Sequence, residues 1–181
     1  MGRRRSRPSL VILAIALFGC SPQEVGVAPT SPSRRSLAPL YRQRPRTLES
    51  SETAPTQLEW PLRGVLSSRF GPREGHPHDG IDLSVSDGTE VHAAATGEVV
   101  YSGSGLRGYG NLIILRHGGG LVTIYAHNSE LRVAVGARIE RGQVIALSGH
   151  SGRATAPHLH FEVRLDDQPR DPELYLPPSP H

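Results

Sequence analysis

The chain has 181 residues, enough for one domain of ordinary size and a further segment. Its formal charge of +3 arises at the N-terminus: from Cys20 onward there are 16 arginines and 17 acidic residues, and from Gln57 onward 11 and 14. The balance argues against nucleic-acid binding, and the single cysteine excludes an internal disulfide or a cysteine-rich zinc site.

The first twenty residues have the order of a secretory signal. Four arginines precede an apolar run at 10–18, and Gly19 and Cys20 follow it. Nine apolar residues are too few to span a bilayer, which needs about 20. Leu17 to Cys20 resembles a bacterial lipobox. We therefore expect residues 1–19 to be removed and Cys20 to be lipidated, although an ordinary cleaved signal with an incidental cysteine is the alternative.

Export sets the expected location. Ser21 follows Cys20 where an aspartate often marks retention at the inner membrane, so we expect a lipid-anchored protein on the periplasmic face of the outer membrane. Residues 20–56 are rich in Pro, Ser, Thr and Arg and lack a regular apolar period. Such a segment buries too little surface to offset its ordering entropy, which predicts a flexible tether.

The folded domain is expected over 57–177, with a short tail at 178–181. Short β-prone runs follow one another between glycines, at 80–85, 97–103, 111–117, 121–127, 143–148 and 158–165. No segment shows apolar residues at helical spacing over a useful length. This pattern predicts an all-β fold, a small antiparallel sandwich or barrel-like domain.

The first stretch with candidate metal-ligating side chains is His76-Pro77-His78-Asp79-Gly80-Ile81-Asp82. His78 and Asp82 are four residues apart, and Gly80 between them permits a tight turn that brings both side chains to one point. An imidazole and a carboxylate are both zinc ligands. His76 offers a second imidazole nearby, and only the spacing to Gly80 and Asp82 favours His78.

The last patterned stretch, 158–165, alternates polar and apolar residues. Period 2 places His158, His160 and Glu162 on one face of a half-buried strand and the apolar residues on the other. A surface strand that merely carries two histidines is the alternative. Combined with His78 and Asp82, His160 completes a three-ligand set with a fourth position open, as in catalytic zinc sites.

His127 ends the apolar run 121–127, where a buried histidine with ordinary hydrogen bonds is the commoner case. Four further histidines belong to no motif with other candidate site residues, and we expect no site role for them: His92, His117, His150 and His181.

Four motifs in this order resemble the lysostaphin/LytM-type zinc endopeptidases, which cleave peptide bonds in bacterial peptidoglycan. They are Arg69-Phe70-Gly71, His78-Asp79-Gly80-Ile81-Asp82, Tyr125-Ala126-His127 and His158-Leu159-His160-Phe161-Glu162. The resemblance covers 57–177 and implies a groove across an antiparallel sheet. It implies zinc held by His78, Asp82 and His160, with His127 and His158 beside the catalytic water. Ala156 replaces a glycine that is usual before the last motif.

The resemblance also carries an alternative function. Some members of the family bind and activate a cell-wall amidase, but these have typically lost ligands, and all five positions are present here. Residues 94–99 and 141–145 also look like biotinyl or lipoyl carrier domains, which need a lysine that this chain lacks. The expected partners are peptidoglycan peptides, a membrane through Cys20, and a cell-wall amidase or division protein.

Overall fold

The computed structural model describes residues 37–41, 57–73, 75 and 77–178 of the chain. Apart from two short helical turns, the regular elements of these residues are all strands, so the predicted all-β fold is confirmed. The strands are β1 (Val65–Ser68), β2 (Ile81–Ser84), β3 (Glu90–His92), β4 (Gly97–Gly103), β5 (Asn111–Arg116), β6 (Leu121–Asn128), β7 (Glu130–Leu131), β8 (Arg138–Ile139), β9 (Val144–Leu147), β10 (His158–Leu165) and β11 (Gln168–Arg170). A helical turn α1 (Ala38–Tyr41) precedes them and a 3-10 turn η1 (Pro172–Leu174) follows.

All six runs expected from the sequence are strands, and β4 and β10 have the predicted bounds at both ends. The strands that the sequence did not reveal are β1, β3, β7, β8 and β11. Each of these has only two to four residues. Such short segments cannot display a repeating period, so neighbouring strands define them rather than their own sequence.

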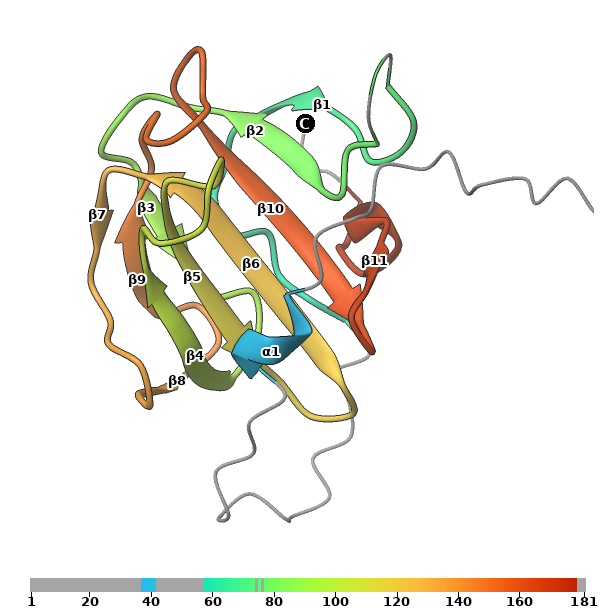
Figure 1. Cartoon of the computed structure of the whole chain (residues 1–181), viewed down its shortest axis with the longest axis vertical. Helices are drawn as coiled ribbons and strands as arrows, with labels where there is room; N and C mark the ends of the chain where they lie inside the picture. Colours follow the sequence, from blue (N-terminus) through green and yellow to red (C-terminus); the bar gives the residue numbers. More distant parts are fainter. Residues whose placement is uncertain (1–36, 42–56, 74, 76, 179–181) are drawn as a thin grey trace, which may run out of the picture. The chain divides into compact units, whose positions relative to one another are not determined.

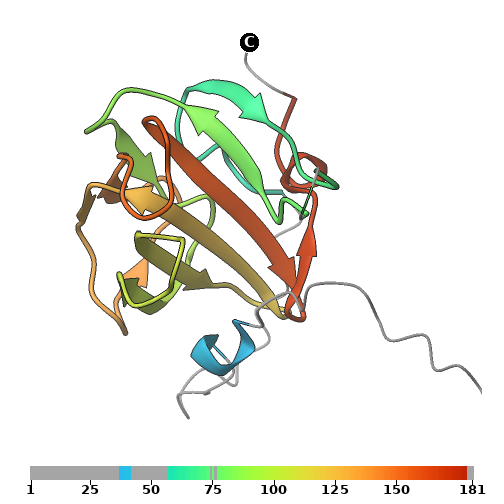
Figure 2. The same cartoon turned by 45° about the horizontal axis from the view of Figure 1, so that its top comes forward.

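The described strands form two antiparallel sheets. The larger has eight strands in the order β1-β2-β10-β6-β5-β4-β8, with β11 paired to β10, and the smaller has the order β3-β9-β7. Figures 1 and 2 both show β10 between β2 and β6, the position that matters for the site. Within the described part of the chain, no helix is long and apolar enough to cross a membrane.

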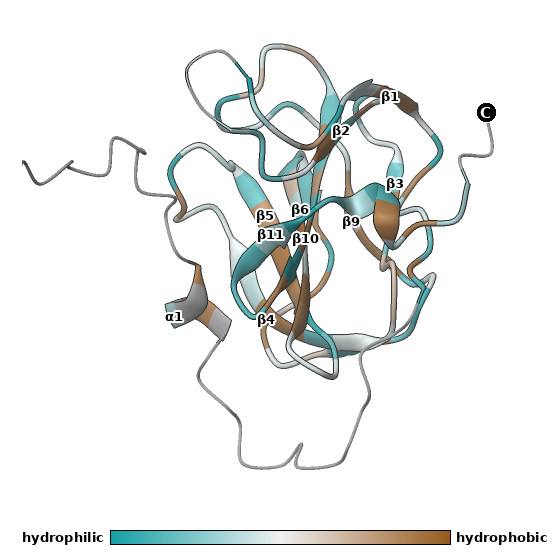
Figure 3. Ribbon diagram, turned by 90° about the vertical axis from the view of Figure 1, so that its right-hand side faces the viewer, coloured by the Kyte–Doolittle hydropathy of each residue, from teal (hydrophilic) through white to brown (hydrophobic). Residues whose placement is uncertain are grey.

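The main core takes side chains from both sheets. On β10 the apolar residues Leu159, Phe161 and Val163 are buried in it, as the alternation predicts. Side chains from β3 and β9 of the smaller sheet join the same cluster. Figure 3 shows brown, the colour of apolar residues, along parts of the strands near the labels β4 and β10, with teal polar segments between. This burial holds β10 rigidly and fixes the direction of the intervening polar side chains.

The opposite face of the larger sheet is also covered. His160 pairs with Ala126 and Glu162 pairs with Ile124, so these four side chains share one face. A second apolar cluster lies there, formed by Leu112, Ile114, Val122, Ile124 and Ala126 with Leu37 from the segment expected to be a tether. The polar face of β10 is therefore buried as well, which differs from the half-buried strand expected from the sequence.

Candidate metal centre

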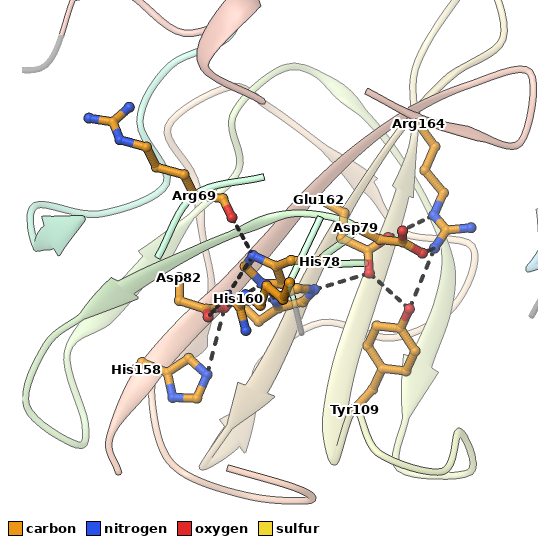
Figure 4. A network of polar contacts seen from close by, with 10 residues as sticks. Arg69, His78, Asp79, Asp82, Tyr109, His158, His160, Glu162 and Arg164 are labelled. Carbon is orange, nitrogen blue, oxygen red and sulfur yellow. Dashed lines mark hydrogen bonds and ion pairs between the residues drawn. The ribbon is translucent and has the colours of Figure 1, made fainter. Parts of the chain in front are cut away.

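Three side chains from two adjacent strands meet at one point. Asp82 on β2 lies directly opposite His160 on β10, and His78 precedes β2 in a bridge with Gly71. Asp82 Oδ1 is 2.8 Å from His160 Nδ1 and 3.1 Å from His78 Nε2, and the two nitrogens are 3.1 Å apart. Among the described residues these three form the group able to hold a metal ion. The structure thus brings together the predicted ligand set (Figure 4).

Gly80 allows this meeting for a reason that the sequence did not reveal. We expected a glycine that makes a tight turn, but a Cβ atom on Gly80 would lie 2.3 Å from the Phe161 carbonyl oxygen and 2.9 Å from Glu162 Cγ. Real Cβ atoms essentially never approach a backbone oxygen so closely. The missing side chain lets the segment from His78 to Asp82 lie directly against β10.

We predict that Gly80→Ala separates the two segments that carry the proposed metal ligands. The added methyl group meets backbone rather than a flexible side chain, so the segment must shift, at a cost of roughly 1–3 kcal/mol or more in unfolding free energy. Zinc retention should fall sharply. Gly88→Ala is a control for removing a glycine, because nothing lies within 4 Å of its Cβ position. Its positive φ adds backbone strain without touching the site. Equal zinc loss in both variants would contradict this explanation.

Each proposed histidine ligand makes a hydrogen bond that leaves one nitrogen for a metal. His78 Nδ1 donates to the Arg69 carbonyl oxygen at 2.8 Å, which leaves Nε2 toward Asp82. His160 Nε2 donates to Glu162 Oε1 at 3.0 Å, which leaves Nδ1 toward the same point. Arg73 Nη2 lies close to His78 Nδ1 but donates to Asp82 Oδ2 at 3.0 Å. The backbone oxygen of Arg69 gives the Arg69-Phe70-Gly71 motif a physical role at the site.

His127 and His158 also use one ring nitrogen for a hydrogen bond and leave the other toward the site. His127 Nδ1 donates to the Ser151 carbonyl oxygen and His158 Nδ1 to that of Ala156, both at 2.8 Å. Their ring centroids are 4.7 Å apart, and His158 Nε2 is 3.9 Å from Asp82 Oδ1. Each ring therefore keeps its Nε2 available beside the cluster of His78, Asp82 and His160.

A bulge in β6 turns His127 toward the site. Regular alternation after the core residue Tyr125 would place His127 on the core face, because Ala126 lies on the site face. Between the pairs Ile113–Tyr125 and Asn111–Asn128, β6 has one residue more than β5, and His127 has a φ of 65°. Such a conformation is rare outside glycine and re-aims the side chain. His127 thereby lies 5.9 Å from His160, ring to ring.

The environment sets the charge of these groups. Burial disfavours a charge on His160, but its hydrogen bonds to Asp82 and Glu162 outweigh burial and raise the pKa of His160 to about 9. Burial would raise the pKa of Asp82, but hydrogen bonds from His160 and His78 hold it well below its usual range. For His127 burial dominates and lowers the pKa to about 4. His127 is therefore neutral at pH 7 and able to accept a proton.

Behind His160 lies a buried polar network that the sequence did not reveal. Tyr109 donates to Glu162 Oε1 at 2.8 Å, and Arg164 Nε donates to Glu162 Oε2 at 2.7 Å. Arg164 Nη2 also reaches Asp79 Oδ2 at 3.5 Å. Burial would raise the pKa of Glu162, but the bond from His160 and the charge of Arg164 outweigh it and lower that pKa to about 2. Glu162 thus remains an ionised acceptor behind His160 (Figure 4).

The remaining described histidines lie outside the cluster. His117 is buried and contacts the Thr96 carbonyl and the Thr123 hydroxyl. His92 and His150 lie beside the carboxylates of Glu90 and Asp87. His76 and His181, like Cys20, lie outside the described residues.

Comparison with known proteins identifies the family. The model of peptidase family M23 matches residues 76–172, the range that contains all five predicted site residues. The chain belongs to peptidase family M23. The resemblance drawn from the four motifs is thereby confirmed. The structure of a peptidase from Vibrio cholerae, described as zinc-containing, resembles this chain with a TM-score of 0.61 and 32% identity, over 67% of this chain and 40% of that one.

Two curated relatives are lipoproteins or activators by name. The outer membrane antigenic lipoprotein B of Haemophilus influenzae is 37% identical over 169 residues, which are 89% of this chain and 41% of the relative. The murein hydrolase activator NlpD of Salmonella dublin is 40% identical over 134 residues, which are 74% of this chain and 35% of the relative. The chain thus matches less than half the length of each of these two relatives.

The site fits a divalent metal on its own chemistry. Two imidazole nitrogens and one carboxylate oxygen, all within 4.8 Å of one another, are donors that zinc accepts. The hydrogen bonds from His78 Nδ1 and His160 Nε2 leave both facing nitrogens suited to coordination.

Proposed function

We propose that this M23 protein is a zinc-dependent endopeptidase that hydrolyses peptide bonds in bacterial peptidoglycan. The observation that carries the proposal is the orientation of four histidines, each with one ring nitrogen hydrogen-bonded away from the centre. His78, Asp82 and His160 would hold the metal. When bound, zinc would polarise the scissile carbonyl and make a water molecule nucleophilic at neutral pH.

His127 and His158 would handle protons in this reaction. His127 is neutral at pH 7 because burial lowers its pKa to about 4, so its Nε2 can accept the proton of the attacking water. His158 Nε2 lies 3.9 Å from Asp82 Oδ1 and, once it carries a proton, can donate a hydrogen bond to the developing oxyanion or pass that proton to the leaving amine. The backbone carbonyls that hold their Nδ1 atoms fix both rings before substrate arrives.

A second function is favoured by one observation, the relative named as a murein hydrolase activator. In that case the domain would bind a cell-wall amidase without cleaving substrate itself. The intact cluster of His78, Asp82 and His160 supports the peptidase, because an activator needs no metal-ligand geometry.

The test is digestion of purified cross-linked peptidoglycan peptides by the full chain, with products identified by mass spectrometry. Cleavage should stop with a chelator and return with added zinc. Cleavage by protein shown to be free of metal would refute the zinc peptidase.

We further propose that the mature protein begins at lipidated Cys20 and is anchored at the outer membrane. The named outer membrane lipoprotein among its relatives supports this. Cys20→Ala should move the protein from the membrane to the soluble fraction when cells are fractionated, because acyl chains contribute about 0.8 kcal/mol per buried methylene. Ser21→Ala is the matched control and should leave the distribution unchanged. Membrane attachment that survives Cys20→Ala would disprove the anchor.

A further inference from the structure

Arg164 connects the two segments that carry the proposed ligands. Its side chain is 2% exposed, although it carries a full charge. On one side its Nε lies 2.7 Å from Glu162 Oε2, and Glu162 accepts the hydrogen bond of His160. On the other side its Nη2 lies 3.5 Å from Asp79 Oδ2, and Asp79 directly follows His78 in the chain. Figure 4 shows Arg164 beside Glu162 and Asp79, away from the ligand atoms.

Stability alone is a poor reason for these charges. Burying an ion pair carries a large desolvation cost, and well-packed apolar side chains often stabilise the fold as well or better. The neighbouring residues on this face, Ile124 and Val122, are apolar and lie directly opposite Glu162 and Arg164. Apolar residues at positions 162 and 164 could therefore have extended the apolar cluster that contains Val122 and Ile124.

The charged groups instead act on ligand geometry. An ionised Glu162 fixes the His160 ring with Nε2–H toward the carboxylate and Nδ1 toward the ligand cluster. Tyr109 donates to the same carboxylate and holds it from the other side. Gly80 packs against Glu162 Cγ, so the ligand-bearing turn meets the same side chain.

We propose that Asp79, Glu162 and Arg164 form a positioning clamp that aligns the His78–Asp82 segment with His160 for a divalent metal. The clamp rests on the proposed zinc site and deepens it. Its members act through His78 and His160, and Arg164 is the bridge between them. Removing either carboxylate should therefore weaken zinc binding although neither carboxylate is among the three proposed ligands.

The test compares Glu162→Gln and Asp79→Asn with Glu98→Gln in the full chain. Glu98 pairs with Arg116 at 2.8 Å on the same sheet, three strands from β10, and its side chain is 14% exposed. It therefore controls for the loss of a partly buried ion pair. Zinc dissociation constants would be measured by competition with a chromophoric chelator, and metal-free unfolding by circular dichroism.

Glu162→Gln is expected to weaken zinc binding about 10- to 100-fold, and Asp79→Asn about tenfold. Glu98→Gln should bind zinc as the wild type does. Because both clamp variants act through Arg164, the double variant should lose less than the product of the single losses. The visible absorption of the cobalt-substituted protein should also change in both clamp variants, since it reports ligand geometry rather than stability.

Each outcome separates the clamp from the peptidase. Wild-type zinc affinity and an unchanged cobalt spectrum in both clamp variants would overturn the clamp alone, as would an equal loss in Glu98→Gln. If Glu162→Gln fails to fold, Asp79→Asn, whose side chain is 19% exposed, decides the matter. A wild-type chain that binds no zinc would overturn both proposals. Weakened zinc binding in the clamp variants of a chain without peptidase activity supports the clamp and refutes the peptidase.

Discussion

Alanine at His78, Asp82 or His160 is expected to abolish stoichiometric zinc binding and peptidase activity together. Each substitution removes one of three donor atoms that lie within about 3 Å of one another. Two remaining protein donors cannot hold the metal against a chelator. Metal content by atomic spectroscopy, measured beside wall-peptide cleavage, checks this result.

The same experiment should give a different result at the other two histidines. His127→Ala and His158→Ala remove side chains whose Nδ1 atoms bond backbone oxygens outside the cluster, so zinc should stay near stoichiometric. Activity should nevertheless fall by roughly two or more orders of magnitude, because proton transfer and oxyanion stabilisation are lost. Zinc lost from His158→Ala but kept by His160→Ala would reverse the roles assigned to the two histidines of β10.

A second large effect is expected from pH. In the proposed site the metal would bind unprotonated His160 Nδ1. Burial opposes a charge on His160, but Asp82 and Glu162 outweigh it and raise the pKa of His160 to about 9. Below pH 9 zinc must displace a proton, so the apparent zinc affinity should fall about tenfold for each pH unit. Between pH 9 and pH 7 the expected loss is therefore about a hundredfold. Above pH 9 the affinity should level off.

Two measurements check this proton displacement. Chelator competition at several pH values gives the slope, and calorimetry in buffers of different ionisation enthalpy should show about one proton released per zinc at pH 7.5. His127 does not complicate the result, because its pKa of about 4 keeps it neutral across this range. Zinc binding without pH dependence and without proton release would contradict this account of a proton held on His160.

The residue pattern was sufficient to predict the strands that carry the proposed metal ligands. The alternation in 158–165 placed Phe161 in the core and His160 on the opposite face, because β10 is regular along its whole length. The spacing of His78 and Asp82 suggested that their side chains meet, and they do. The role of Gly80 was not predicted, because it depends on close contact with the Phe161 carbonyl oxygen of β10 rather than on a tight turn.

Two features depended on contacts that no local pattern encodes. His127 reaches the site through a bulge defined by the register between β5 and β6, whereas strict alternation would have turned it into the core. Arg164 lies two positions after Glu162 and four after His160, so strand alternation alone would have placed it on their face of β10. Its burial, however, depends on Asp79 lying beside it. Both cases required the pairing of strands to be known.

The most direct test of the peptidase is the identity of the bond broken in peptidoglycan by the zinc-loaded chain, with and without a cell-wall amidase. The proposal predicts new amino termini within the peptide cross-links from the chain alone, and their absence with His158→Ala. Mass spectrometry distinguishes these products from peptides released by amidase cleavage at the glycan. Intact cross-links from the chain alone, together with faster amidase cleavage when the chain is added, would show an activator and contradict the peptidase.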